Sequence, residues 1–200
     1  MIAIVDYEMG NLASVSNALA YLGIQHEITQ NPERIVQADK VILPGVGAFA
    51  DAIRLMRKKG LDQAVQEVGK RNIPLLGICL GMHLLFTESY EDGIHQGLNL
   101  IPGKVIHFSN HQLKVPHMGW NTVNLQKQHP WGLQKNILAY FYFVHSYYVV
   151  PDEAEVILGT TLYGQEFVSA VACNNIWATQ FHPEKSGVDG LTLIRTFGAD

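Results

Sequence analysis

The sequence predicts an α/β fold, a three-layer αβα sandwich whose central sheet is mainly parallel. Short apolar runs that are typical of buried strands alternate with helical patterns through the first half of the chain. These runs lie at residues 2–5, 24–28, 41–43 and 74–78. Strands that alternate with helices form parallel sheets covered on both faces, which gives the three layers.

Helical periodicity separates the predicted strands. The apolar residues between Asn11 and Gly23 fall on one face of a first helix. Asn11 can cap this helix and Gly23 can end it. The pattern resumes over 49–71 and again over 79–88, and a final helix is expected over about 189–197.

The second half of the chain is richer in strands. Several segments there combine aromatic and β-branched residues in an extended pattern. They lie at residues 104–108, 139–144, 147–150, 156–160, 167–172 and 176–181. No repeat or linker interrupts the chain, so residues 1–200 are expected to form a single domain.

Composition excludes several classes of function. The chain has 48% apolar and 16% charged residues and a net charge of −4, which does not favour a nucleic-acid partner. No apolar run approaches the ~20 residues that cross a bilayer, and the N-terminus lacks a signal-peptide pattern. We therefore expect a cytoplasmic protein without a membrane partner. Its two cysteines, Cys79 and Cys173, do not form a disulfide framework.

The strongest motif is Gly77-Ile78-Cys79-Leu80-Gly81, between a predicted strand and a predicted helix. This is the context of a nucleophile elbow, in which the turn exposes the central side chain. A thiol at a helix N-terminus also lies near the positive end of the helix dipole, which favours the thiolate. Free cysteines are usually buried small hydrophobic residues, but this setting favours a nucleophile.

A candidate base follows the last predicted strand. His182 and Glu184 are two residues apart, so in an extended segment both side chains lie on one side. A carboxylate behind an imidazole orients the ring and supports its protonated form. Alone, this pair is also compatible with a solvated turn. The catalytic interpretation is favoured because the predicted nucleophile Cys79 needs a base. Cys173 has no such partner nearby and is interpreted as structural.

A third motif, Pro44-Gly45-Val46-Gly47, also follows a predicted strand. Its glycines can turn backbone N–H groups toward a developing oxyanion. An ordinary strand-ending turn explains the motif as well. In parallel sheets ligands bind beyond the carboxyl ends of the strands, where both glycine-rich turns lie.

Together these motifs resemble the class I glutamine amidotransferases, and the resemblance covers essentially the whole chain. Five further segments resemble the branch of that family that serves histidine biosynthesis. They are Asp6-Tyr7-Glu8-Met9-Gly10-Asn11, Pro44-Gly45-Val46-Gly47-Ala48-Phe49, Pro116-His117-Met118-Gly119-Trp120-Asn121, Phe143-Val144-His145-Ser146-Tyr147 and Phe181-His182-Pro183-Glu184-Lys185-Ser186.

The resemblance implies a glutaminase that needs no cofactor. Cys79 would attack the side-chain amide of L-glutamine, with His182 as acid and base and Glu184 as its orienting group. The backbone N–H of Leu80 and one from the 44–47 turn would hold the oxyanion. The substrate pocket would be lined by Gly45, Val46, Gly47, Leu80, His83, His145, Ser146 and Tyr147. An aromatic-rich core strand is the competing interpretation for the last three.

The resemblance also implies a partner. Ammonia would pass to a separate (β/α)8-barrel cyclase subunit that makes imidazole glycerol phosphate, because this chain leaves no room for an acceptor domain. Asn11, Trp120 and Lys185 match positions expected near that interface. A helix cap, a partly buried aromatic and a solvated charge are the alternatives. We expect no metal, because His107, His111, His117 and His129 lack metal-ligand spacing.

One residue departs from the family pattern. His83 stands where the family usually carries Gln, four residues after the nucleophile, so substrate affinity or its pH dependence is expected to differ.

Three other functions compete with the histidine pathway. One is a paralogous amidotransferase that supplies ammonia for an amidino sugar of a surface polysaccharide, and His83 slightly favours it. The others are a stand-alone thiol hydrolase and a catalytically silent regulatory subunit. The intact Cys79, His182 and Glu184 argue against a silent subunit.

Overall fold

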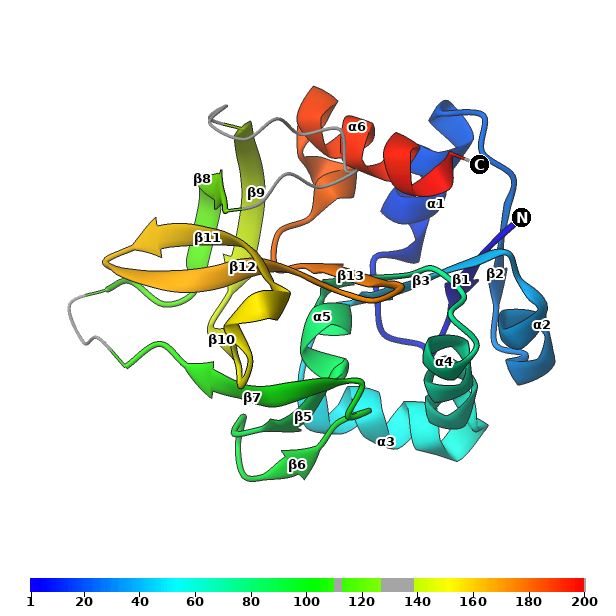
Figure 1. Cartoon of the computed structure of the whole chain (residues 1–200), viewed down its shortest axis with the longest axis horizontal. Coiled ribbons are helices and arrows are strands. Elements are labelled where there is room, and N and C mark those ends of the chain that lie inside the picture. Colours follow the sequence, from blue (N-terminus) through cyan, green and yellow to red (C-terminus); the bar gives the residue numbers. More distant parts are fainter. Residues whose placement is uncertain (110–112, 127–138, 200) are drawn as a thin grey trace.

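The computed structural model describes residues 1–109, 113–126 and 139–199. One half of its large central sheet is parallel and runs in the order β2-β1-β3-β4-β13 (Figure 1). These strands are β1 (Ile2–Val5), β2 (His26–Thr29), β3 (Lys40–Gly45), β4 (Leu75–Cys79) and β13 (Ile176–Thr179). The helical segments between them make the parallel order possible, as the sequence predicts.

The other half of the sheet is mostly antiparallel and continues from β13 through β12, β10, β7, β5 and β6. A branch of β11, β8 and β9 leaves it at β12. The strands are β5 (Phe86–Ser89), β6 (His95–Gln96), β7 (Ile101–His107), β8 (His117–Leu125), β9 (Ala139–His145), β10 (Tyr147–Pro151), β11 (Ile157–Tyr163) and β12 (Gln165–Cys173). The predicted α/β class is confirmed. Most of the parallel pairing lies in one half, and the other half has one parallel pair, β5 with β7.

Helices cover both faces of the parallel half. In Figure 1, α1 (Leu12–Tyr21) and α6 (Gly187–Gly198) lie above it, and α3 (Phe49–Lys59) and α4 (Leu61–Lys70) lie below. The strands supply both cores by alternation, since Ile4 packs with the α1 and α6 side and Val5 with the α3 and α4 side. The remaining helices are α2 (Pro32–Gln37), α5 (Leu80–Leu84) and the 3₁₀ turns η1 (Ala154–Val156) and η2 (Pro183–Lys185).

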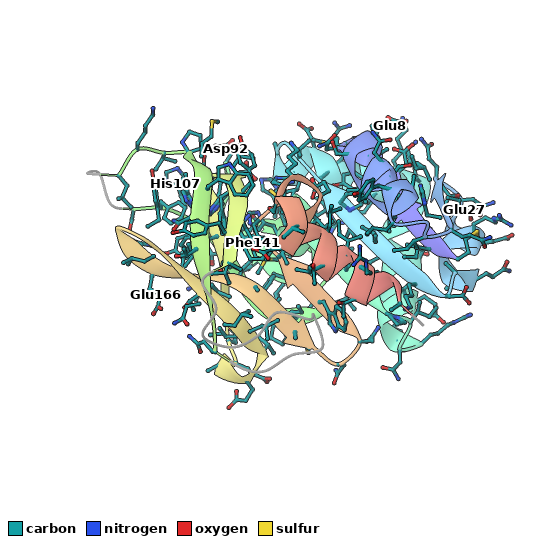
Figure 2. The ribbon with its side chains drawn as sticks, turned by 90° about the horizontal axis from the view of Figure 1, so that it is seen from above. Glu8, Glu27, Asp92, His107, Phe141 and Glu166 are labelled. Carbon is teal, nitrogen blue, oxygen red and sulfur yellow. The ribbon has the colours of Figure 1, made fainter. Side chains whose placement is uncertain are left out.

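Aromatic rings fill the core where β9 meets α6. Phe141 stacks on Phe181 with ring centroids 4.0 Å apart, and both side chains are fully buried. Figure 2 shows Phe141 in the interior, whereas Glu8 and Glu166 lie on the outside at opposite ends. None of the described helices is long and apolar enough to cross a membrane.

Several elements differ from the sequence prediction. The helix expected over 49–71 is two helices, because Gly60 adopts a left-handed conformation (φ 69°) that ends α3. The helix expected to run to residue 88 ends at Leu84, and the chain turns into β5. Both α2 and β8 were not predicted, although Asn31 caps α2 by accepting the Glu33 N–H at 2.8 Å.

Two glycines bring α5 against the sheet. A Cβ on Gly77 would lie 3.1 Å from the backbone carbonyl carbon of Gly81. A Cβ on Gly81 would overlap the Leu43 carbonyl oxygen on β3, at 1.8 Å. The tight strand–helix turn therefore needs glycine at both places.

We expect Gly81→Ala to lower the free energy of unfolding by about 3 kcal/mol, because the rigid β3 backbone cannot move away from the new methyl group. Urea denaturation measures the change. Gly10→Ala is the matched control, because its Cβ would meet nothing closer than 3.7 Å, and its effect should stay below about 1 kcal/mol. Equal effects of the two substitutions would contradict this packing argument.

Candidate active site

Cys79 is the last residue of β4 and immediately precedes α5. Its backbone has φ 53° and ψ −110°, which a non-glycine residue adopts only when the surrounding structure holds it there. In the β3–β4 register it lies opposite Gly45, whose added Cβ would lie 2.9 Å from the Leu80 Cβ. Close packing of β3 and α5 thus holds the nucleophile elbow that the sequence predicts.

His182 and Glu184 form a buried pair beside the elbow. The His182 Nδ1 lies 2.8 Å from the Glu184 Oε1, and each side chain is only 1% exposed. The prediction of an extended segment was wrong, because β13 ends at Thr179 and Glu184 lies in the η2 turn. The turn nevertheless brings both side chains together. Backbone pairing fixes the position of His182, whose N–H donates to the Tyr142 carbonyl on β9 at 2.9 Å.

His182 is held in its protonated form. Burial lowers its pKa, but the interactions of the ring with Cys79 and Glu184 outweigh burial and raise the pKa to about 10. Because Nδ1 faces Glu184, Nε2 is the ring nitrogen left for Cys79, and it has no hydrogen-bond partner among the described residues. Cys79 itself is 6% exposed. An imidazolium held by a carboxylate beside an elbow cysteine can activate that cysteine as a nucleophile.

A pocket of about 280 Å³ opens at Cys79. Seven of the eight residues predicted to bind substrate line it, and the eighth, Gly45, pairs with Cys79 beneath it. The lining is Val46, Gly47, Cys79, Leu80, His83, Glu91, Pro116, Val144, His145, Ser146 and Tyr147. Gly47 has φ +97°, a conformation that favours glycine, and Tyr7 anchors the turn by donating to the Pro44 carbonyl at 2.8 Å.

Glu91 was not predicted from the sequence. It follows β5, a segment interpreted as helix, so no pattern placed it near the cysteine. Its carboxylate accepts the Phe49 N–H at 2.9 Å and lines the pocket. Burial raises its pKa, and the hydrogen bond from Phe49 opposes that rise. The pocket therefore has an acidic group that can face a cationic substituent.

His83 is buried and neutral. Its Nε2 lies 2.7 Å from the Gln180 Oε1, and burial lowers its pKa to about 4 even though this hydrogen bond opposes the shift. Gln180 in turn donates from its Nε2 to the Cys79 Sγ at 3.9 Å. An imidazole with this pKa does not titrate near neutral pH. The expected effect of His83 on substrate affinity, or on its pH dependence, stays a prediction.

His145 lies in a hydrogen-bonded chain whose direction is fixed. Its Nδ1 donates to the Tyr147 carbonyl at 2.8 Å, so the Nε2 of the neutral ring accepts from the His117 Nδ1 at 2.9 Å. Asn121 completes the chain by donating to the His117 Nε2 at 3.2 Å. Burial first of all lowers the pKa of both rings, to about 3 for His145 and about 4 for His117. The His145 ring therefore lines the pocket, but both of its nitrogens are already hydrogen-bonded.

The three residues predicted for a partner interface lie outside the pocket, on elements that touch one another. Trp120 is 57% exposed on β8 and packs edge-on against Tyr142 of β9. Lys185 is exposed in η2, which contacts both β9 and α1, and Asn11 precedes α1. Asn11 makes no capping hydrogen bond from its side chain, and Trp120 is not a core residue.

The described residues contain no group of three or more His, Cys, Asp or Glu side chains placed to hold a metal ion. His107 and His117 lie among them, whereas His111 and His129 lie outside the described residues.

The sequence model of the family described as "Glutamine amidotransferase class-I" matches residues 3–198, so the chain belongs to this family. The resemblance seen in the motifs is confirmed. Solved structures share the fold: a glutamine amidotransferase has a TM-score of 0.76 at 20% identity, covering 98% of this chain and 97% of that one. PurLQS from Thermotoga maritima has a TM-score of 0.79 at 16% identity, covering 98% and 96%.

Curated relatives show to which branch of the family the chain belongs. The imidazole glycerol phosphate synthase subunit HisH of Moorella thermoacetica is 52% identical over 199 residues, which is 98% of this chain and 93% of the relative. That of Sulfurimonas denitrificans is 51% identical over 203 residues, 98% of this chain and 97% of the relative. Within the class I amidotransferases the chain therefore belongs with the HisH subunits, and the amidino-sugar alternative is not favoured.

The opposite charge states of the buried histidines can be measured by NMR of the ring nitrogens. We expect His182 to remain protonated at neutral pH and to titrate near pH 10. His83 should remain neutral between about pH 5 and pH 8. Because the pKa of His182 is raised by folding, its contribution to stability is complete below about pH 6.5 and is lost as the pH rises through 10.

Glu184→Gln supplies the comparison, since it removes the charge behind the ring and should lower the pKa of His182. Titration of His182 near its ordinary value of 6.5 in the wild type would contradict the assignment.

Proposed function

We propose that this chain hydrolyses L-glutamine at Cys79 and delivers the ammonia to a separate cyclase subunit in histidine biosynthesis. The observation that carries the proposal is the elbow cysteine next to a buried, charged His182–Glu184 pair, at the base of a pocket of about 280 Å³. Family membership supports the amidotransferase chemistry, and the names of the relatives support the pathway.

The proposed reaction begins from the thiolate–imidazolium pair. The Cys79 sulfur attacks the side-chain amide carbon of glutamine, and the protonated His182 gives its Nε2 proton to the leaving nitrogen, which departs as ammonia. A thioester to the glutamyl group remains. The neutral His182 then takes a proton from water, whose oxygen attacks the thioester, and glutamate leaves as the thiolate is restored. Glu184 keeps the ring oriented throughout.

The oxyanion of each tetrahedral intermediate needs hydrogen-bond donors near Cys79. We assign this role to the Leu80 N–H at the start of α5 and to an N–H of the Val46–Gly47 turn, both of which line the pocket. A missing donor of this kind usually costs on the order of 10²–10³-fold in rate. Glycine at position 47 allows that peptide to reorient at little steric cost.

Recognition of the amino-acid end of glutamine falls to the outer part of the pocket. Glu91 provides the negative charge for the α-ammonium group. The hydroxyl and backbone N–H groups of Ser146 and Tyr147 are the candidate donors to the α-carboxylate. Glutamine analogues that lack either charge should therefore bind more weakly.

The proposed docking face for the cyclase contains Asn11, Trp120 and Lys185. Beside it lies a hollow of about 420 Å³ between α1, η2 and α6, to which Glu184 and Lys185 both contribute. Exposed Met118 and Tyr140, on the same strands as Trp120 and its neighbour Tyr142, add apolar surface. An exposed apolar face of this kind is typical of protein–protein contact. The resemblance to the family indicates a (β/α)8 barrel as its partner.

The central test is glutamate release with and without the histidine-pathway cyclase and its ribonucleotide substrate. We expect strong activation in the wild-type complex and loss of at least about 10³-fold in Cys79→Ser, because an alcohol is a far weaker nucleophile than a thiolate. Cys173→Ser is the matched control and should retain wild-type activity, since Cys173 lies at the far end of β12. Failure of the wild-type pair to form imidazole glycerol phosphate would favour another ammonia acceptor.

Trp120→Ala should weaken association with the cyclase by about thirtyfold in Kd, the effect of losing an interface tryptophan worth ~2 kcal/mol. Titration calorimetry measures it. Ile28→Ala is the control, because Ile28 is 45% exposed on β2 at the opposite edge of the sheet and should not affect binding. Unchanged affinity of Trp120→Ala would remove β8 from the proposed interface.

A further inference from the structure

A chain of hydrogen bonds between side chains crosses four strands and ends at the pocket wall. It begins at the Leu162 carbonyl on β11, which accepts from the Asn121 Nδ2 on β8 at 3.1 Å. The same Asn121 group lies 3.2 Å from the His117 Nε2, and the His117 Nδ1 lies 2.9 Å from the His145 Nε2 on β9. This histidine chain ends where the His145 Nδ1 meets the Tyr147 carbonyl on β10, at 2.8 Å. All four strands lie in the same half of the sheet (Figure 1).

Carbonyl groups at both ends fix the direction of the histidine chain. A carbonyl can only accept, so Asn121 donates at one end and the His145 Nδ1 carries a hydrogen at the other. Burial lowers the pKa to about 3 for His145 and to about 4 for His117, so each ring is neutral, with one N–H and one lone pair. Both rings therefore carry their hydrogen on Nδ1. Asn121 agrees with this direction, because its oxygen already accepts the Thr122 N–H at 2.8 Å.

Aromatic neighbours fix the plane of each ring. His117 stacks on Tyr163, with ring centroids 4.1 Å apart, and on Phe143, with centroids 4.9 Å apart. The centroid of the His145 ring lies 5.1 Å from that of Phe167. Because His117 and His145 are both buried, a ring nitrogen that lost its partner in the chain would be left unsatisfied. Loss of one member therefore disturbs the next.

The end of the histidine chain shapes the bend between β9 and β10. Ser146 alone separates the two strands, and its carbonyl accepts the Phe108 N–H at 3.2 Å. The His145 ring bonds across this bend to the carbonyl two residues further on. His145, Ser146 and Tyr147 line the pocket, whereas His117 is not among the described residues that line it. An influence of His117 on the pocket must therefore pass through the His145 ring.

We propose that His117, oriented by Asn121, is a positioning residue that holds the bend at residues 145–147 in the shape that binds glutamine. The inference rests on the proposed glutaminase function and extends it to a residue outside the pocket. The His117 N–H keeps the His145 ring turned so that its Nδ1 stays on the Tyr147 carbonyl. The bend then presents its hydroxyl and backbone N–H groups to the α-carboxylate of the substrate.

A residue that only fills space would respond to substitution differently from one that donates a hydrogen bond. Phenylalanine has nearly the shape of the His117 ring and can stack on Tyr163, but it has no N–H for His145. Asparagine is smaller, yet its NH₂ group takes about the place of Nδ1 and can donate to His145. The two variants therefore rank in opposite order for packing and for positioning.

His117→Phe should raise KM for glutamine about tenfold in the complex with the cyclase and its ribonucleotide substrate, and leave kcat within about twofold of the wild type. His117→Asn should keep KM within about threefold of the wild type, because the donor to His145 is retained. It should nevertheless unfold at a lower temperature than His117→Phe, since it leaves space beside Tyr163 and Phe143. Rates of glutamate release give both constants, and thermal unfolding gives the order of stability.

NMR of the ring nitrogens tests the histidine chain without any substrate. In the wild type, His117 and His145 should both show the tautomer with hydrogen on Nδ1 and a lone pair on Nε2. His145 should keep this tautomer in His117→Asn and show a mixture of tautomers in His117→Phe, where nothing donates to its Nε2.

His26→Phe is the matched control. Both nitrogens of His26 are hydrogen-bonded as well, to the Ser16 hydroxyl at 2.8 Å and to the Ile24 carbonyl at 2.9 Å. His26 lies on β2 at the far edge of the sheet, so its loss should leave KM for glutamine unchanged.

A wild-type KM in His117→Phe, or a higher KM in His117→Asn than in His117→Phe, would overturn the positioning role. Hydrogen on Nε2 of either ring in the wild type would overturn the direction of the chain. Failure of the proposed function is a separate result, since the wild-type complex would then release no glutamate while both rings kept their hydrogen on Nδ1.

Discussion

The close approach of α5 to β3 determines the geometry of the whole site. Gly81 places its α-carbon against the Leu43 carbonyl, and a methyl group there would lie only 1.8 Å from the oxygen. Two residues before Gly81, at the end of β4, Cys79 adopts its positive-φ conformation, so the chain enters α5 directly against β3. The strain is concentrated at the one side chain that must leave the sheet plane and enter the pocket. His182, Gln180 and the 44–47 turn then meet it from neighbouring strands.

Around this cysteine, identical side chains hold opposite charge states. The pKa of His182 is raised because its interactions with Cys79 and Glu184 outweigh the effect of burial, which keeps the ring protonated. Burial lowers the pKa values of His83 and His145, and no anion offsets that effect, so both rings stay neutral. The Nε2 atom of His182 thus carries the proton that the proposed reaction gives to the leaving nitrogen of glutamine. The neutral rings are equally useful, since a second cation would stabilise the thiolate further and repel the ammonium end of a glutamine substrate.

The sequence predicts the parts of this site that depend on local patterns. The elbow, the His182–Glu184 spacing and the glycine-rich turn are short motifs at strand ends, and parallel strands bring such ends to one edge. Contacts between distant segments were not predictable: Gln180 meets His83 across 97 residues, and β8, which carries His117, has no clean strand pattern. Glu91 was missed for a related reason, because the segment before it changes from helix to strand only through tertiary pairing with β7.

The position of η2 connects the two sides of the molecule. Lys185 follows Glu184 in this turn, and the Ser186 hydroxyl accepts the Tyr142 N–H at 3.0 Å, while Tyr142 packs against Trp120. The His182 N–H also donates to Tyr142. We expect a displacement of β9 or η2 by the proposed partner on that face to move the His182–Glu184 pair relative to the Cys79 backbone, which belongs to β4 and α5. Because hydrogen transfer depends steeply on such distances, a partner can regulate the proposed glutaminase without entering its pocket.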